Sequence, residues 1–145
     1  MVDISSKATT QREAVASGQV IIGPDAFNLL VDSKILKGDV LAVARIAGIM
    51  AAKKVGSMIP LCHPLTLQNI EIDFTPNPEK NAIEILARAK AKGSTGAEME
   101  VLTAVSIAAL TIYDMCKSIE KNITIEKIQL NYKTGGKSGT WKRKI

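Results

Sequence analysis

Residues 69–90 read NIEIDFTPNPEKNAIEILARAK, and they indicate the central hairpin of a β-sheet. Apolar and polar residues alternate around Ile72 and again around Ile85, with the period of two that is typical of strands with one buried and one exposed face. The TPNP segment at residues 75–78 indicates the turn between the two strands. We therefore expect acidic side chains on the exposed face of the first strand to lie opposite basic side chains of the second.

Further predicted elements lie on both sides of this hairpin. We expect a strand over 14–22, a short helix over 24–31, a helix that begins after the N-cap Asp39 and ends at Gly56, a long helix over about 96–121 and a last strand over about 124–133. This order predicts an α+β fold, a ferredoxin-like split β-α-β-β-α-β sandwich with helices on one face of the sheet. We expect a single domain over residues 1–145, with mobile arms at 1–11 and 140–145, and an oligomer favoured by the open face of the sheet.

The composition excludes several classes of protein. Hydrophobic residues make up 46% of the chain but aromatic residues only 3%, which predicts an aliphatic core. The polar start, Met1–Ser6, does not resemble a secretory signal. The charge-free run Val101–Tyr113 is shorter than the roughly 20 apolar residues of a membrane span, so we expect no membrane segment. Two cysteines do not make a disulfide framework, so we expect a reducing, cytoplasmic location.

The net charge of +5 favours an anionic partner, either a nucleic acid or a phosphorylated small molecule. Apart from the basic cluster Lys142–Lys144 the lysines are scattered, and few aromatic residues are available for base stacking. We therefore expect no nucleic-acid partner. A solvated surface accounts for most of the charges without any partner.

The segment IPLCHPL at residues 59–65 holds the only histidine of the chain, His63. Its two prolines stiffen the backbone and prevent a helix, so the imidazole lies on a rigid, mostly apolar loop. Two interpretations stand: a histidine that bonds a backbone carbonyl, or a binding residue. A zinc site of Cys62, His63 and Cys116 is disfavoured, because adjacent ligands chelate poorly and the chain has no second histidine.

Asp114 and Lys117 lie three residues apart near the end of the long predicted helix. A simple ion pair explains Lys117, because a cation is favourable near a helix C-terminus. It explains Asp114 poorly, because an acid there opposes the helix dipole. Asp114 continues a helical stripe through Ile107 and Leu110, and a carboxylate in a partly apolar site beside a lysine suits acid–base chemistry.

The start of the same helix carries two acids, Glu98 and Glu100. Thr95 and Glu98 match a capping box, so we assign Glu98 a structural role, whereas capping does not explain Glu100. Met99 suits the core, with the wall of a ligand site as the alternative. Glu100 and Asp114 lie about 21 Å apart along the helix, so a small substrate that touches both needs two subunits.

The segment Lys133–Gly139 contains two adjacent glycines and two lysines, but it is not a P-loop. The required glycine is replaced by Asn131, and no helix follows. A flexible loop of this kind holds phosphate through backbone amides and ammonium groups, and the alternative is a solvated linker.

Several segments together resemble the cyclic pyranopterin monophosphate synthase family, the second enzyme of molybdenum cofactor biosynthesis. The likeness runs from Met1 to about Gly139 and rests on Lys37–Val40, Ala44–Ile49, Ile59–Leu65, Thr95–Glu100, Leu102–Ala104, Ala108–Lys117 and Lys133–Gly139. The chain differs by its own tail from Thr140 and by lacking the longer leader of some relatives.

The resemblance implies a lyase that converts 3′,8-cyclo-dihydro-GTP to cyclic pyranopterin monophosphate and pyrophosphate. It implies a ferredoxin-like fold and a homo-oligomer, a hexamer built from dimers with sites at subunit contacts. It also implies no cofactor, with a magnesium ion on the substrate phosphates left open.

The resemblance also assigns the site residues. It implies that Asp114 is catalytic and that Lys117 works beside it. The residues implied to bind substrate are Leu61, Cys62, His63, Met99, Glu100, Lys37 and Lys133. Acids and bases suit the proton transfers of ring opening and closure, and lysines suit phosphates.

Two other classes compete with this reading. A non-catalytic anion-binding oligomer, such as a nucleotide sensor, would gain nothing from a carboxylate at Asp114. A nucleic-acid module would bind DNA or RNA with strong salt dependence.

Overall fold

The computed structural model describes residues 1–144, and nine elements follow one another along the chain. They are β1 (Thr10–Ile21), α1 (Gly23–Val31), α2 (Val40–Ala52), α3 (Val55–Met58), β2 (Leu67–Asn77), β3 (Ala82–Gly93), α4 (Glu98–Cys116), β4 (Thr124–Thr134) and β5 (Trp141–Lys142).

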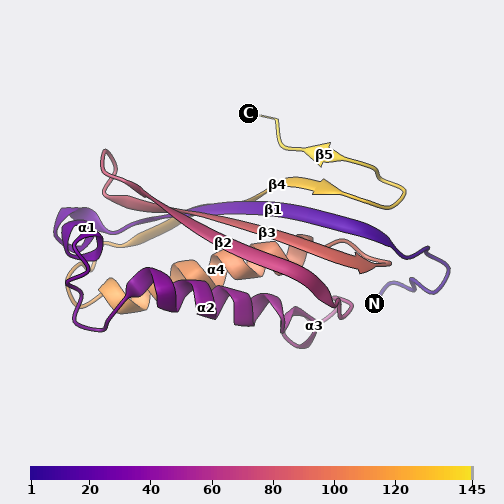
Figure 1. Ribbon diagram of the computed structural model, residues 1–145, viewed down its shortest axis with the longest axis horizontal. Coiled ribbons are helices and arrows are strands. Elements are labelled where there is room, and N and C mark those ends of the chain that lie inside the picture. Colours follow the sequence, from indigo (N-terminus) through magenta and orange to yellow (C-terminus); the bar gives the residue numbers. More distant parts are fainter. Residues whose placement is uncertain (145) are drawn as a thin grey trace.

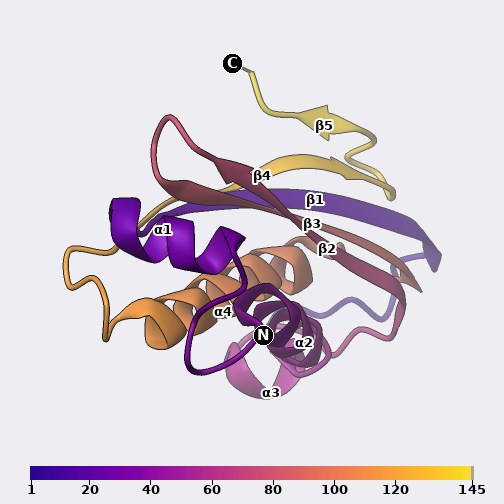
Figure 2. The ribbon, with the colours of Figure 1, turned by 60° about the vertical axis from the view of Figure 1, so that its left-hand side comes forward.

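The strands form one antiparallel sheet in the order β2-β3-β1-β4-β5 (Figure 1). The first four strands have the ferredoxin-like arrangement, so the predicted α+β sandwich is confirmed. The predicted hairpin is β2 and β3, and Arg88 donates to the Asp73 carboxylate across it at 2.7 Å. The helices lie on one face of this sheet, as Figure 2 shows, and the other face is open.

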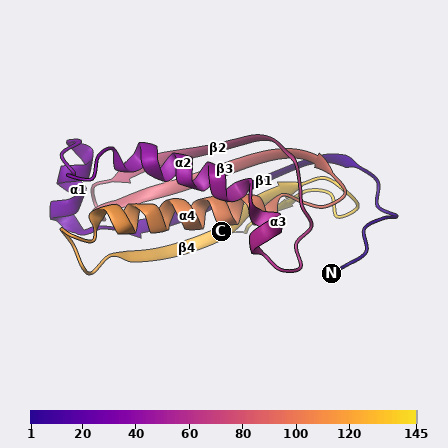
Figure 3. The same ribbon diagram turned by 90° about the horizontal axis from the view of Figure 1, so that it is seen from below.

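The core is aliphatic and lies between the sheet and the helix layer. Small residues allow α2 and α4 to approach closely: a Cβ added at Gly48 would come within 2.8 Å of the Ala104 carbonyl oxygen. Figure 3 shows these two helices side by side beneath the sheet. By length and composition α4 could cross a membrane, but half of its most hydrophobic window is buried inside the domain, which is the position of a core helix.

The long helix is shorter than predicted at both ends. We expected 96–121, but α4 ends at Cys116, whose carbonyl accepts the amides of Ile119 at 2.9 Å and Glu120 at 3.2 Å as the chain turns away. The predicted capping box is wrong, because Ala97 is the N-cap and makes no side-chain cap bond. The Glu98 carboxylate instead bonds Lys133 on β4, a partner that sequence spacing does not reveal.

The predicted start of α2 is confirmed, since the Ala42 amide donates to the Asp39 carboxylate at 3.1 Å. Its predicted end at Gly56 is wrong, because α2 ends at Ala52 and Gly56 lies in α3. A Cβ at Gly56 would come within 2.9 Å of the Pro64 Cα, so this glycine lets the His63 loop pack against α3.

The sheet also extends into the segments expected to be mobile. Thr10 and Gln11 belong to β1, and Trp141–Lys142 pair with β4 as β5. Residue 145 of the predicted C-terminal arm lies outside the described residues.

Candidate functional site

The first group of predicted site residues lies at the C-terminal end of α4. Lys37, in the loop before α2, donates to the Asp114 carboxylate at 3.1 Å and to its backbone carbonyl at 2.8 Å. Lys117, one helical turn from Asp114, contacts the other carboxylate oxygen at 2.7 Å. The structure therefore joins Lys37 to the predicted pair across 77 residues of sequence.

Two ammonium groups control the charge of Asp114. Hydrogen bonds from Lys117 and Lys37, together with their charges, hold its pKa below the usual range. The hydrogen bond and charge of Asp114 raise the pKa of Lys117 in turn. Both side chains are thus ionised at neutral pH.

The surroundings of Asp114 differ from the expectation. We expected a partly apolar site, but within this chain its side chain is 58% exposed. Leu110, which precedes it on the same stripe, is exposed as well. The stripe faces outward because α4 already buries its other sides against the sheet and α2.

The second group lies at the N-terminal end of α4. The Glu98 carboxylate and the Lys133 ammonium group are 2.7 Å apart. Burial raises the pKa of Cys62, and the charges of Glu100 and Glu98 raise it further, so the His63 loop lies near these acids. Cys62 and His63 are half-buried.

Glu100 is a buried acid with an unsatisfied oxygen. It is only 2% exposed, and its Oε2 has no hydrogen-bond partner among the described residues. Burial raises its pKa to about 7, and the charge of Glu98 adds to this against a backbone hydrogen bond. A carboxyl group of this kind exchanges a proton near neutral pH.

The two remaining predicted binding residues, Met99 and Leu61, are more exposed than Glu100. Met99 is half-buried on α4, and Leu61 is largely exposed in the His63 loop.

A cavity of about 910 Å³ opens beside the second group. Its lining includes Glu98, Lys133 and residues 6–8 of the N-terminal segment. It also includes residues 135–138 after β4, which we call the glycine loop. Asp114, Glu100 and the His63 loop do not line it. The cationic side chains in its wall are Lys7, Arg12, Lys133 and Lys137.

Arg12 is a cavity residue that the sequence analysis missed. It is 9% exposed, and its Nε donates to the Gly93 carbonyl at 3.2 Å. A side chain at Gly136 would overlap its guanidinium group, so the glycine loop packs directly against it. The missed signal is alternation: Arg12 shares the core-facing side of β1 with Ala14 and Ala16, where a charged residue is unusual.

Within one chain the two groups remain apart. The 14 residues from Glu100 to Asp114 span about 21 Å of helix. Across residues 1–144 no group of three or more His, Cys, Asp or Glu side chains is arranged to hold a metal ion.

Comparison with known proteins identifies relatives along the whole chain. The MoaC family profile matches residues 1–136. A cyclic pyranopterin monophosphate synthase of Chloroflexus aurantiacus is 57% identical over 143 residues, which cover 99% of this chain and 88% of the relative. A synthase of the same name from Heliobacterium modesticaldum is 56% identical, over 99% of this chain and 90% of the relative. One from Salinibacter ruber is 53% identical, over 99% and 85%.

Proposed function

Because the chain belongs to the MoaC family, we propose that it converts 3′,8-cyclo-dihydro-GTP to cyclic pyranopterin monophosphate and pyrophosphate. The family and the names of its relatives make it an enzyme of the lyase class, acting on a small molecule in molybdenum cofactor biosynthesis. The observation that carries the proposed chemistry is Asp114, a carboxylate held between the ammonium groups of Lys37 and Lys117.

Cyclic phosphate formation needs cations around the phosphates. A sugar hydroxyl attacks the α-phosphorus and forms a new P–O bond, while the bond to the bridging oxygen breaks. Pyrophosphate leaves with the electron pair of that bond, and the hydroxyl proton passes to a base. Cations stabilise the charge that develops on the leaving group. Lys37 and Lys117 at one end of α4, and Arg12 and Lys133 at the other, supply such charges.

Opening and re-closing the purine-derived ring needs several proton transfers. Asp114 is ionised and serves as a base, with Lys117 beside it as an acid. Glu100, with a pKa of about 7, takes up and releases a proton at neutral pH. His63 on its proline-flanked loop completes the set of acids and bases.

We infer that each site is shared between two subunits, because one substrate cannot reach both ends of α4. A second copy that packs on this helix in the opposite direction would bring its Asp114 to the Glu100 of the first. A two-fold axis would produce two such sites in each dimer.

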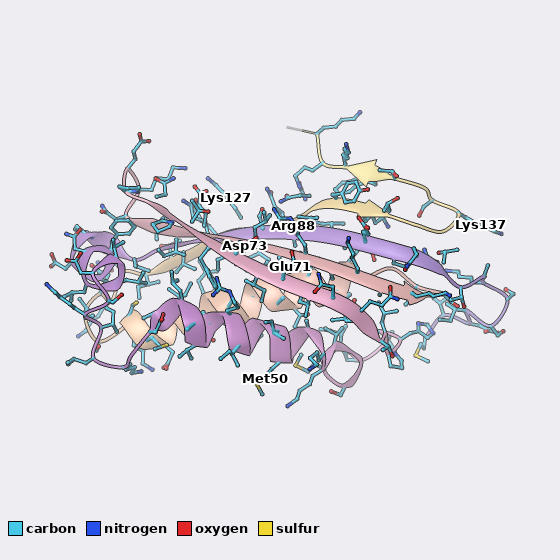
Figure 4. The ribbon with its side chains drawn as sticks, viewed as in Figure 1. Met50, Glu71, Asp73, Arg88, Lys127 and Lys137 are labelled. Atoms are coloured by element: carbon cyan, nitrogen blue, oxygen red, sulfur yellow. The ribbon has the colours of Figure 1, made fainter. Side chains whose placement is uncertain are left out.

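The outer helix surface supports this assembly better than the open sheet face. Val43, Ile46 and Met50 are exposed on α2, and Leu110 is exposed on α4. Figure 4 shows Met50 on the side of α2 away from the sheet. An exposed apolar patch of this kind is typical of a subunit contact.

The open sheet face, by contrast, carries charged pairs. Asp73 and Arg88 lie there at 2.7 Å (Figure 4), and Glu13 and Lys90 lie there at 3.8 Å. The proposed hexamer, built from dimers, therefore begins with a helix-to-helix contact. The cytoplasm remains the proposed location.

A non-catalytic anion sensor is the competing function. Its support is the cationic cavity, which would bind a nucleotide without turnover. The carboxylate of Asp114 favours the enzyme, because an acid repels phosphates and adds nothing to a simple phosphate binder.

The test is incubation of the purified protein with 3′,8-cyclo-dihydro-GTP, followed by detection of pyrophosphate and a cyclic-phosphate pterin. The proposal includes no resident cofactor, so turnover is expected without one. Parallel reactions with Mg²⁺ and with EDTA test whether a magnesium ion must accompany the substrate phosphates. Tight substrate binding without either product would favour the sensor.

A further inference from the structure

One lysine in the wall of the cationic cavity is already paired with an acid of the same chain. The Lys133 ammonium group, which reaches the cavity from β4, lies 2.7 Å from the Glu98 carboxylate in the first turn of α4. Their side chains are 34% and 26% exposed, which makes this the least exposed ion pair in residues 1–144. Glu98 therefore neutralises part of the Lys133 charge and occupies one of its three N–H donors, so it weakens the attraction of Lys133 for a phosphate.

The local structure holds the Glu98 carboxylate in this place. A side chain at Gly96 would overlap it, so this glycine leaves the space that the carboxylate fills. Burial acts to raise the pKa of Glu98, but the hydrogen bond from Lys133 and the charges of Lys133 and Arg12 keep it below the usual range. The carboxylate is thus ionised and competes as an anion.

The other acid in the cavity wall has a different partner. Glu13 lies 3.8 Å from Lys90 on the open face of the sheet. Within residues 1–144, Glu98 is accordingly the acid that forms an ion pair with a cavity cation.

We propose that Glu98 is a positioning residue that competes with pyrophosphate for Lys133 and so promotes release of this product. The inference rests on the proposed function. When the triphosphate enters, Lys133 turns from Glu98 to the phosphates. After the P–O bond breaks, Glu98 recaptures Lys133 and weakens the hold of the site on pyrophosphate. Glu98 forms no covalent bond in this cycle.

The sign of the effect separates this role from a structural one. If Glu98 competes, its neutral isostere should bind pyrophosphate about twofold to fivefold more tightly, the upper part of the range for one partly exposed ion pair. If Glu98 only held Lys133 in a useful position, the isostere should bind pyrophosphate more weakly.

Titration calorimetry of the full-length protein in its native assembly, with sodium pyrophosphate as the probe, measures this directly. The control for Glu98→Gln is Asp73→Asn, which also removes one negative charge but on the open sheet face. This control should change the affinity for pyrophosphate less than twofold. Glu98→Asp, which withdraws the carboxylate by one methylene, should bind with intermediate affinity and replaces Glu98→Gln if that variant does not fold. Unchanged or weaker pyrophosphate binding in the Glu98 variants would overturn the inference.

A double-mutant cycle tests whether the effect passes through Lys133. In a Lys133→Ala background, Glu98→Gln should no longer increase the affinity, and an increase of the same size there would refute the mechanism. The calorimetry needs no turnover, so it is separate from the test of activity. If the wild-type protein forms product but the Glu98 variants bind pyrophosphate with unchanged affinity, only this inference is contradicted and the proposed function stands. Wild-type protein that binds no pyrophosphate contradicts the phosphate site itself.

Discussion

Replacing Glu100 with glutamine should remove a pH-dependent loss of stability. The pKa of this acid is raised from 4.5 to about 7, mainly by burial. An acid whose pKa is higher in the folded state binds more protons when the protein is folded. Its contribution to the free energy of unfolding is therefore complete below about pH 4.5 and is lost as the pH rises through about 7.

The magnitude follows from the size of the pKa shift. A change of about 2.5 pH units corresponds to roughly 3 kcal/mol at 1.36 kcal/mol per unit. Solvent does little to reduce the free-energy cost of ionising Glu100, because this side chain is only 2% exposed. A typical domain is stable by only about 5–15 kcal/mol, so the effect is large enough to measure.

Urea unfolding at pH 5 and pH 8, at one fixed protein concentration, measures the prediction. Between these values the wild-type protein should lose about 2–3 kcal/mol through this group, and Glu100→Gln should lack that loss. Glu79→Gln, in the exposed turn between β2 and β3, is the matched control and should follow the wild type. An equal loss of stability in wild type and Glu100→Gln would refute the reasoning that Glu100 is buried with a raised pKa.

Three further predictions concern the reaction. Asp114→Asn should lower kcat at least about 100-fold while circular dichroism and assembly stay unchanged, because it removes the base between two lysines; near-normal release of pyrophosphate would remove Asp114 from the mechanism. Lys37→Ala and Lys133→Ala should each weaken the binding of a GTP analogue in calorimetry, and unchanged affinity in both variants would move the phosphate site elsewhere. His63→Ala should slow turnover. Mixing inactive Glu100→Ala chains with inactive Asp114→Ala chains should restore activity once subunits exchange, and no recovery after proven exchange would mean that each site is built within one chain.

Local patterns in the sequence predicted the elements well where a short-range rule applies. Alternation with a period of two located β2 and β3, and a side chain that bonds a nearby amide located the start of α2 at Asp39. The pairing of Asp114 with Lys117 followed from helical spacing alone. The limits of α4 did not follow from local rules. Its end depends on bonds to the Cys116 carbonyl after the chain turns, and at its start Glu98 bonds a lysine of β4 instead of capping the helix.

The sequence alone established the order of β1 to β4 with α1, α2 and α4, the chemistry-bearing residues on α4 and, through long matched motifs, the family. Tertiary structure alone decided that Lys37 meets Asp114, that Arg12 and Lys133 share a cavity, and that Glu100 is buried with a raised pKa while Asp114 is exposed. The physical reason is range. Periodicity and capping act over a few residues, whereas burial and ion pairing depend on which distant segments the packed sheet and helix layer bring into contact.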